Sequence, residues 1–183
     1  VGAFRRSLPV ADGAWVTLEA NPEHVTEETV AGWRRAGVRT LSLGVQSFDD
    51  GDLALLGRRH DGEAARGALK RAVAAGFDVV SVDLIFGLPG HGPETWRRQL
   101  DIALAGGATH LSCYQLTVHD GTVLGRRAAA GRFREAPESL QAELFHLTFE
   151  HLGRAGWQGY EGPNCAASPA RRSRHNQRDV RPE

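Results

Sequence analysis

Apolar residues are grouped along the chain in two kinds of window, and each kind predicts one type of element. Short runs of aliphatic and β-branched residues predict strands over 15–20, 39–46, 78–87 and 109–117. Apolar residues at helical spacing predict helices over 26–37, 61–76, 92–107, 122–131 and 137–156. Residues 157–162 indicate the start of one more strand. Strands that alternate with helices in this way are typical of βα units and a parallel sheet.

The residues at the helix ends agree with this assignment. Thr26 can cap the first helix, and Glu27 and Glu28 lie in its first turn, where the helix dipole favours negative charge. Asp61 can cap the second helix, and Pro93 stands at the first position of the third. The buried stripe expected on the second helix consists of Ala65, Leu69, Ala72 and Val73.

The extent of the fold follows from the same pattern. The strands are almost continuously apolar, which is usual where a sheet is covered on both faces. No low-complexity linker occurs before about residue 162. The chain is therefore predicted to form one α/β domain over residues 1–161, followed at 162–183 by the truncated or degraded start of a C-terminal region. It contains no methionine, and it opens with "VGAFRRSLPV", so we expect an internal piece of a longer protein.

Charge and composition exclude several classes of protein. The chain has 22 basic and 22 acidic residues, so it lacks the positive charge typical of nucleic-acid-binding proteins. No apolar run is long enough to span a membrane. Two cysteines, Cys113 and Cys165, do not make a disulfide framework, and a cytoplasmic location is the expectation.

Polar residues stand at or near the carboxyl end of each predicted strand. They are Glu19, Gln46, Asp83 and Thr117, in chain order. Because the carboxyl ends of parallel strands share one edge of a sheet or barrel, we expect these residues to line one pocket. Asp83 lies inside the apolar run "VDLIFGLPG", where a carboxylate needs a partner. The positively charged Arg59 can form an ion pair with one of the two carboxylates, Glu19 or Asp83.

The chemistry of these groups favours a small polar ligand. Carboxylate and amide oxygens suit ribose hydroxyls and amino groups, and the chain has neither a GxGxxG segment nor a P-loop to hold phosphates. The glycines of the turn 87–90 allow a ligand to approach the backbone. His60, His91 and His119 lie in predicted loops, where surface placement is the expectation.

Five segments together carry a family resemblance. They are "LEANPEHVT", "RTLSLGVQSFDDGDLALLGRRHD", "VVSVDLIFGLPGHGPETW", "HLSCYQLTVHDGT" and "GYE…SRHN". The combination resembles the oxygen-independent coproporphyrinogen III oxidase-like branch of the radical S-adenosylmethionine (radical SAM) proteins, with "YQLTV" and "DGT" closer to its haem chaperone members. The resemblance implies part of a (βα)6 barrel with parallel strands. It also implies S-adenosylmethionine and a [4Fe-4S] cluster on a CxxxCxxC loop. That loop is absent here and is expected before residue 1, so the chain holds no metal ligand of its own.

The resemblance also implies roles for individual residues. Glu19 matches a carboxylate that contacts S-adenosylmethionine. Gln46, Arg59 and Asp83 match positions that line a second S-adenosylmethionine or substrate pocket, and Thr117 matches another contact, through its backbone. The family often has HNxxYW near its C-terminal region, whereas this chain reads "HNQRDV". His175 is thereby a candidate haem ligand.

The sequence is compatible with three functions. The first is a haem chaperone-like protein that binds haem, S-adenosylmethionine and an iron–sulfur cluster, and passes haem to a recipient protein. The second is an oxygen-independent coproporphyrinogen III oxidase of porphyrin biosynthesis. The third is a cluster-free barrel that binds a metabolite. The 183-residue piece alone is expected to be inactive, because the missing βα units leave a sheet edge unpaired.

Overall fold

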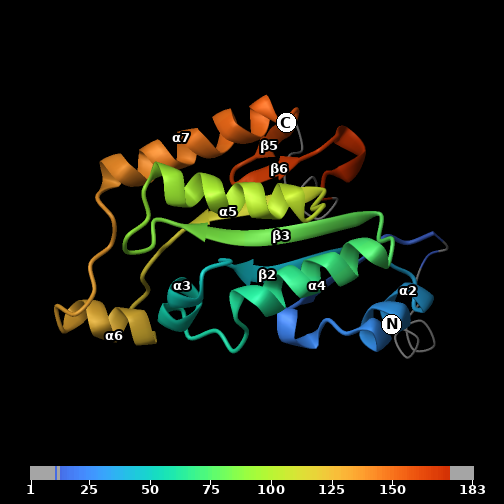
Figure 1. Ribbon diagram of the computed structural model, residues 1–183, viewed down its shortest axis with the longest axis horizontal. Helices are drawn as coiled ribbons and strands as arrows, with labels where there is room; N and C mark the ends of the chain where they lie inside the picture. Colours follow the sequence, from blue (N-terminus) through green and yellow to red (C-terminus); the bar gives the residue numbers. More distant parts are fainter. Residues whose placement is uncertain (1–10, 12, 174–183) are drawn as a thin grey trace.

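The computed structural model describes residue 11 and residues 13–173, and a six-stranded sheet lies at its centre (Figure 1). The strands are β1 (Val16–Ala20), β2 (Val38–Gln46), β3 (Val79–Phe86), β4 (His110–Gln115), β5 (Gln158–Glu161) and β6 (Asn164–Ala166). Their order across the sheet is β1-β2-β3-β4-β6-β5. The first four strands are parallel, which confirms the predicted α/β fold.

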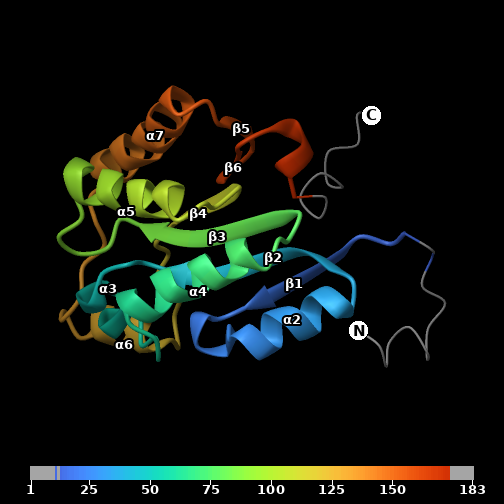
Figure 2. The same ribbon diagram turned by 45° about the vertical axis from the view of Figure 1, so that its right-hand side comes forward.

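Four helices pack along one face of this sheet (Figure 2). They are α2 (Glu27–Arg35), α4 (Gly62–Ala74), α5 (Pro93–Ala105) and α7 (Glu138–Arg154). Two shorter helices, α3 (Asp50–Leu55) and α6 (Val123–Ala129), lie near the carboxyl ends of the parallel strands. Single 3-10 turns are η1 (Pro22–His24) and η2 (Pro169–Arg171). Among the described residues, no helix is both long and apolar enough to cross a membrane.

The last two strands form a hairpin that runs against the parallel set. β6 pairs antiparallel with β4 on one side and with β5 on the other. Only residues 162–163 separate β5 from β6, and so short a connection can join only antiparallel strands. The sequence indicated one more strand over 157–162, which corresponds to β5, but it did not indicate β6. The predicted boundary between residues 161 and 162 falls in the turn of this hairpin.

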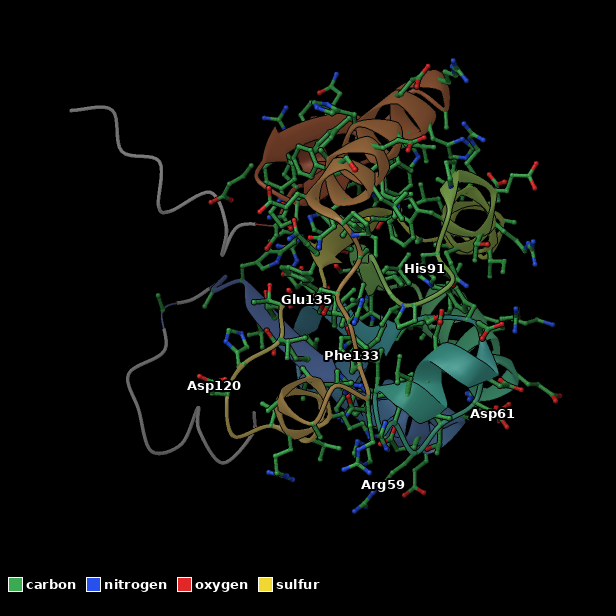
Figure 3. The ribbon with its side chains drawn as sticks, turned by 90° about the vertical axis from the view of Figure 1, so that its left-hand side faces the viewer. Arg59, Asp61, His91, Asp120, Phe133 and Glu135 are labelled. Atoms are coloured by element: carbon green, nitrogen blue, oxygen red, sulfur yellow. The ribbon has the colours of Figure 1, made fainter. Side chains whose placement is uncertain are left out.

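The main apolar core lies between the sheet and the four helices. Every second strand residue contributes to it, such as Leu41, Leu43, Val82 and Leu84, all fully buried. Trp96 of α5 is the largest fully buried side chain. A second, smaller apolar cluster surrounds Leu88, Leu116 and Phe133 and joins α6 to the carboxyl end of the sheet; Figure 3 looks onto this end of the molecule.

The opposite face of the parallel strands is polar. The side chains that alternate with the core residues there include Thr17, Thr40, Ser42, Ser81, Asp83 and Ser112. Thr40, Ser81 and Ser112 are nevertheless buried, at 3%, 4% and 4% exposure, so this face is covered although its side chains are polar. The strands resemble apolar runs in the sequence because small serine and threonine residues occupy several of the alternating positions.

Local sequence explains the helix boundaries. The Thr26 hydroxyl accepts a hydrogen bond from the backbone N–H of Thr29, while the Thr29 hydroxyl accepts one from the backbone N–H of Thr26, which forms a capping box. Asp61 caps α4, as predicted, by accepting from Ala64 N. On α4 the expected buried stripe is wrong in one position, because Val73 is 38% exposed and Ala68 is buried instead.

The start of α4 depends on a glycine. A Cβ at Gly62 would lie 2.3 Å from the Phe48 carbonyl oxygen, and a backbone atom cannot easily give way. We expect Gly62→Ala to lower the free energy of unfolding by about 1–3 kcal/mol, as overpacking usually does. The control is Gly67→Ala on the same helix, where the Cβ would meet only the mobile end of Arg71. That change should stabilise the protein by up to ~1 kcal/mol. Urea denaturation of both variants measures the difference, and equal effects would contradict the prediction.

Candidate functional site

Three of the predicted site residues meet at the carboxyl ends of three neighbouring strands. Glu19 is the last residue but one of β1, Gln46 is the last residue of β2, and Asp83 lies in the second half of β3. Together with Asn21 and Gly44 they line a pocket of about 280 Å³. The pocket offers two carboxylates and two side-chain amides, as the sequence predicted for a polar ligand.

A deeper hollow of about 430 Å³ continues from this pocket along the polar face of the sheet. Glu19 and Asp83 line both spaces. The remaining wall is rich in hydroxyl groups, and it is lined by Thr17, Thr40, Ser42, Val79, Ser81, His110, Ser112, Tyr114 and Ser173. The two spaces therefore share their carboxylates and form one polar cleft.

Asp83 lies between two strands and accepts weak hydrogen bonds. The Ser42 hydroxyl lies 3.3 Å from Oδ1 and 3.4 Å from Oδ2. Ser112 stands opposite Asp83 in the sheet, but its hydroxyl donates to Asn164 Oδ1 at 3.0 Å. Burial raises the pKa of Asp83 to about 6, the neighbouring serine hydroxyls lower it, and the Glu19 charge raises it again. Asp83 is thus poorly compensated by the protein itself and has acceptor capacity for a ligand.

His110 marks the inner part of the hollow. Its Nδ1 lies 2.8 Å from Ser81 Oγ, and its Nε2 lies 2.6 Å from the Tyr160 hydroxyl. Burial lowers the pKa of His110 to about 4, so the imidazole is neutral at pH 7. The hollow therefore carries negative charge at its carboxylates and no compensating positive charge from this histidine.

Gln46 has an unusual backbone conformation. Its φ is +70°, and it is the one non-glycine residue with positive φ among those described. Ser47 N donates to Val45 O at 2.9 Å, which makes Gln46 the central residue of a tight turn. The absence of a side chain at Gly44 makes room for the side chains of Asn21 and Gln46. A Cβ at position 44 would lie only 3.0 Å from Asn21 Oδ1 and 3.2 Å from Gln46 Nε2.

Arg59 and Thr117 do not line the pocket that holds the other three. Arg59 is exposed and lies at the periphery of the carboxyl end of the sheet (Figure 3). Thr117 is exposed and follows β4 beyond its last residue. Neither side chain contacts Glu19 or Asp83 in the structure. Their predicted contacts with a ligand stay predictions.

The surface placement expected for two histidines is wrong. His60 is 6% exposed and His91 is 5% exposed, and only His119 of the three lies at the surface. Each buried ring has polar partners: His60 Nε2 donates to Val45 O at 3.1 Å, and His91 Nε2 donates to Asp52 Oδ2 at 2.8 Å. Loop position alone did not indicate burial, because the partners come from distant parts of the chain.

Sequence reasoning also missed the hydroxyl residues of the hollow. Ser42, Ser81 and Ser112, together with His110, lie within strands, whereas the sequence-based prediction rested on residues at strand ends. Their signal is the period-two alternation of polar residues, which is visible in "SVD" at 81–83 and in "HLS" at 110–112.

No metal site occurs in the part of the chain that the structure describes: no three His, Cys, Asp or Glu side chains are grouped to hold an ion. Cys113 and Cys165 are buried, and burial raises the pKa of both thiols, to about 11 for Cys165. A thiol of this kind is a poor metal ligand at pH 7. The described residues therefore do not fit an iron–sulfur cluster. His175, the candidate haem ligand, lies outside the described residues.

Comparison with known proteins agrees with this architecture. The model of the radical SAM superfamily matches residues 3–102, more than half of the chain. "Heme chaperone HemW" of Mycobacterium tuberculosis is 38% identical over 172 residues, and that of Escherichia coli K12 is 35% identical over 172 residues. Both alignments cover 94% of this chain and 44% of the relative. The chain thus spans less than half the length of these relatives.

A solved structure has the same fold. Coproporphyrinogen III oxidase (HemN) from Escherichia coli, a radical SAM enzyme, superposes with a TM-score of 0.77 at 24% identity, over 90% of this chain and 38% of that protein. At this identity the likeness concerns the fold alone, and it agrees with the four parallel βα units seen here. The matched family model, which covers more than half of the chain, leads to one conclusion, and the HemW relatives and the fold agree with it: the chain belongs to the radical SAM superfamily.

Proposed function

We propose that the polar pocket of Glu19, Gln46 and Asp83 binds S-adenosylmethionine, and that the protein is a haem chaperone-like member of its family. The observation that carries the proposal is the convergence of these three side chains from three strands on one pocket. Radical SAM proteins use S-adenosylmethionine as a radical source when a reduced cluster is present.

The residues present fit this cofactor. S-adenosylmethionine carries an ammonium group, a sulfonium cation and two ribose hydroxyls, all of which favour carboxylate or carbonyl partners. Glu19 and Asp83 supply two carboxylates, and no cation among the described residues forms an ion pair with either one. The missing Cβ at Gly44 leaves the amides of Asn21 and Gln46 free to face the pocket.

Haem is the second ligand proposed. Two proteins named heme chaperones are similar to nearly the whole of this chain, which supports haem as the cargo. His175 is the candidate axial ligand, because imidazole is a common ligand of haem iron. Delivery of haem to a recipient protein would then be the physiological role.

Calorimetric titration of the full-length protein, reconstituted with iron and sulfide without oxygen, tests the cofactor. We expect Glu19→Gln to weaken S-adenosylmethionine binding about tenfold, since a hydrogen bond to a charged group typically contributes about 1.5–3 kcal/mol and Gln retains part of it. The control is Glu143→Gln, an exposed position on α7, which should bind like the parent protein. Equal affinity of the parent and Glu19→Gln would remove Glu19 from the site.

Haem is tested on the same preparation. We expect stoichiometric haem binding, seen as a shifted Soret band, and loss of that shift in His175→Ala. An oxidase would instead release carbon dioxide from coproporphyrinogen III, and a cluster-free binding protein would take up no iron. Either of these results, without haem binding, would exclude the chaperone role.

A further inference from the structure

We infer that Ser47, Asp52 and His91 form a buried positioning chain that holds Gln46 in its ligand-facing conformation. This inference rests on the proposed function of the Gln46 pocket, and it adds three residues that do not touch the pocket themselves. They connect the loop after β2 with the turn after β3. These are the two segments that follow Gln46 and Asp83.

The first observation is the strained backbone of Gln46. A φ of +70° is unfavourable for a residue with a side chain, and such strain persists only where the surrounding structure holds it. Strain of this kind is concentrated at ligand sites, and Gln46 lines the pocket with Glu19 and Asp83. The relevant question is therefore which groups prevent the turn from relaxing.

The hydrogen-bond chain begins on the residue next to Gln46. The Ser47 hydroxyl donates to Asp52 Oδ2 at 2.6 Å and accepts from Asp49 N at 3.1 Å. Ser47 is 1% exposed, so these bonds face little competition from water. They fix the residue immediately after the strained position.

The chain continues across the carboxyl end of the sheet to the next strand's turn. His91 Nε2 donates to the same Asp52 oxygen at 2.8 Å. His91 belongs to the turn "GLPGH" that follows β3, and His91 N donates to Leu88 O at 2.9 Å. In Figure 3 His91 lies between α5 and the α3–α4 region, well inside the outline of the molecule. Asp52 therefore links the loop after Gln46 to the turn after Asp83.

Packing keeps the His91 ring in place. The ring stacks on Trp96 with centroids 6.3 Å apart and planes 27° apart. His91 Nδ1 is buried and has no hydrogen-bond partner among the described residues. The bond from Nε2 to Asp52 therefore is the ring's polar contact within the described part of the chain, and it fixes the orientation of the ring.

Other buried contacts hold the remaining sides of the turn. His60 Nε2 donates to Val45 O, just before Gln46, at 3.1 Å. Phe48 N, two residues after Gln46, donates to Gln99 Oε1 at 2.7 Å. The backbone around Gln46 is thus fixed before and after the strained residue. Asp52 is the member of this set that holds two side chains at once.

A double-mutant cycle on the full-length protein tests the inference, with S-adenosylmethionine affinity as the readout. We expect Gln46→Ala to weaken binding about tenfold. Asp52→Ala should weaken binding at least threefold when Gln46 is present and have no further effect when Gln46→Ala is already made, because it acts through Gln46. Asp52→Asn keeps one carbonyl oxygen for Ser47 and His91, so it should restore most of the affinity.

The control separates positioning from general stability. Asp61→Ala removes the cap of α4, and it should lower the melting temperature without changing the affinity. If Asp52→Ala does not fold, Ser47→Ala takes its place in the cycle. Equal losses of affinity with and without Gln46→Ala, or no loss from Asp52→Ala or Ser47→Ala, would overturn the positioning role alone. Normal affinity in Gln46→Ala would overturn both the pocket and the positioning role.

Discussion

Replacing Trp96 by alanine is expected to lower the free energy of unfolding by about 3–5 kcal/mol, the usual loss for a large aromatic side chain in a core. Trp96 is 0% exposed and packs on Phe86 with ring centroids 5.6 Å apart. Its Nε1 also donates to the Thr148 hydroxyl at 2.8 Å, which joins α5 to α7. The change removes this hydrogen bond and leaves a cavity between the sheet and two helices.

Guanidinium denaturation of the full-length protein, followed by far-UV circular dichroism, measures the loss. The control is Phe145→Ala on α7, where the side chain is 38% exposed and we expect a loss of about 1 kcal/mol or less. If Trp96→Ala destabilised the protein no more than the control, the core between sheet and helices would be assigned incorrectly.

Asp83→Asn is expected to act in the opposite direction and stabilise the ligand-free protein at neutral pH. Burial raises the pKa of Asp83 from 3.8 to about 6 in the folded state. Between these values the folded protein keeps a proton that the unfolded chain has released, so stability falls as pH rises. Above about pH 6 the loss is complete, and it corresponds to up to about 3 kcal/mol. Asparagine carries no charge and avoids this loss.

The measurement is the melting temperature of parent and variant from pH 4.5 to pH 8. We expect the advantage of Asp83→Asn to grow up to about pH 6 and to stay constant above it, while its affinity for S-adenosylmethionine is lower than that of the parent. The control is Asp120→Asn, an exposed loop position, whose melting profile should run parallel to the parent's. A constant difference between Asp83→Asn and the parent at every pH would contradict the raised pKa.

Much of the fold could be predicted from the sequence because its signals are local. Thr26 and Asp61 cap their helices as predicted, and each parallel strand was located to within a few residues. The meeting of Glu19, Gln46 and Asp83 could also be predicted, since parallel strands bring their carboxyl ends together. Because the same βα unit is repeated along the chain, residues near the end of each strand occupy equivalent places in the fold, and their meeting can be predicted from the sequence.

The remaining features depend on contacts between distant residues. The burial of His91 requires Asp52, 39 positions away in the sequence, and no local pattern indicates that pair. The strain at Gln46 is likewise invisible in the sequence, because glutamine is not a residue that usually adopts positive φ. Both features follow from how the loops after β2 and β3 are packed together.

The alternation of polar and apolar side chains along the parallel strands separates the residues needed for folding from the residues that face a ligand. Residues such as Leu41 and Val82 determine whether the protein folds, whereas their immediate neighbours Ser42 and Asp83 face the cleft and contribute little to the core. Evolution can therefore exchange cleft residues for new ligand specificity without disturbing the layer beneath the helices. A single sheet of this design can accommodate diverse chemistry while its architecture stays constant.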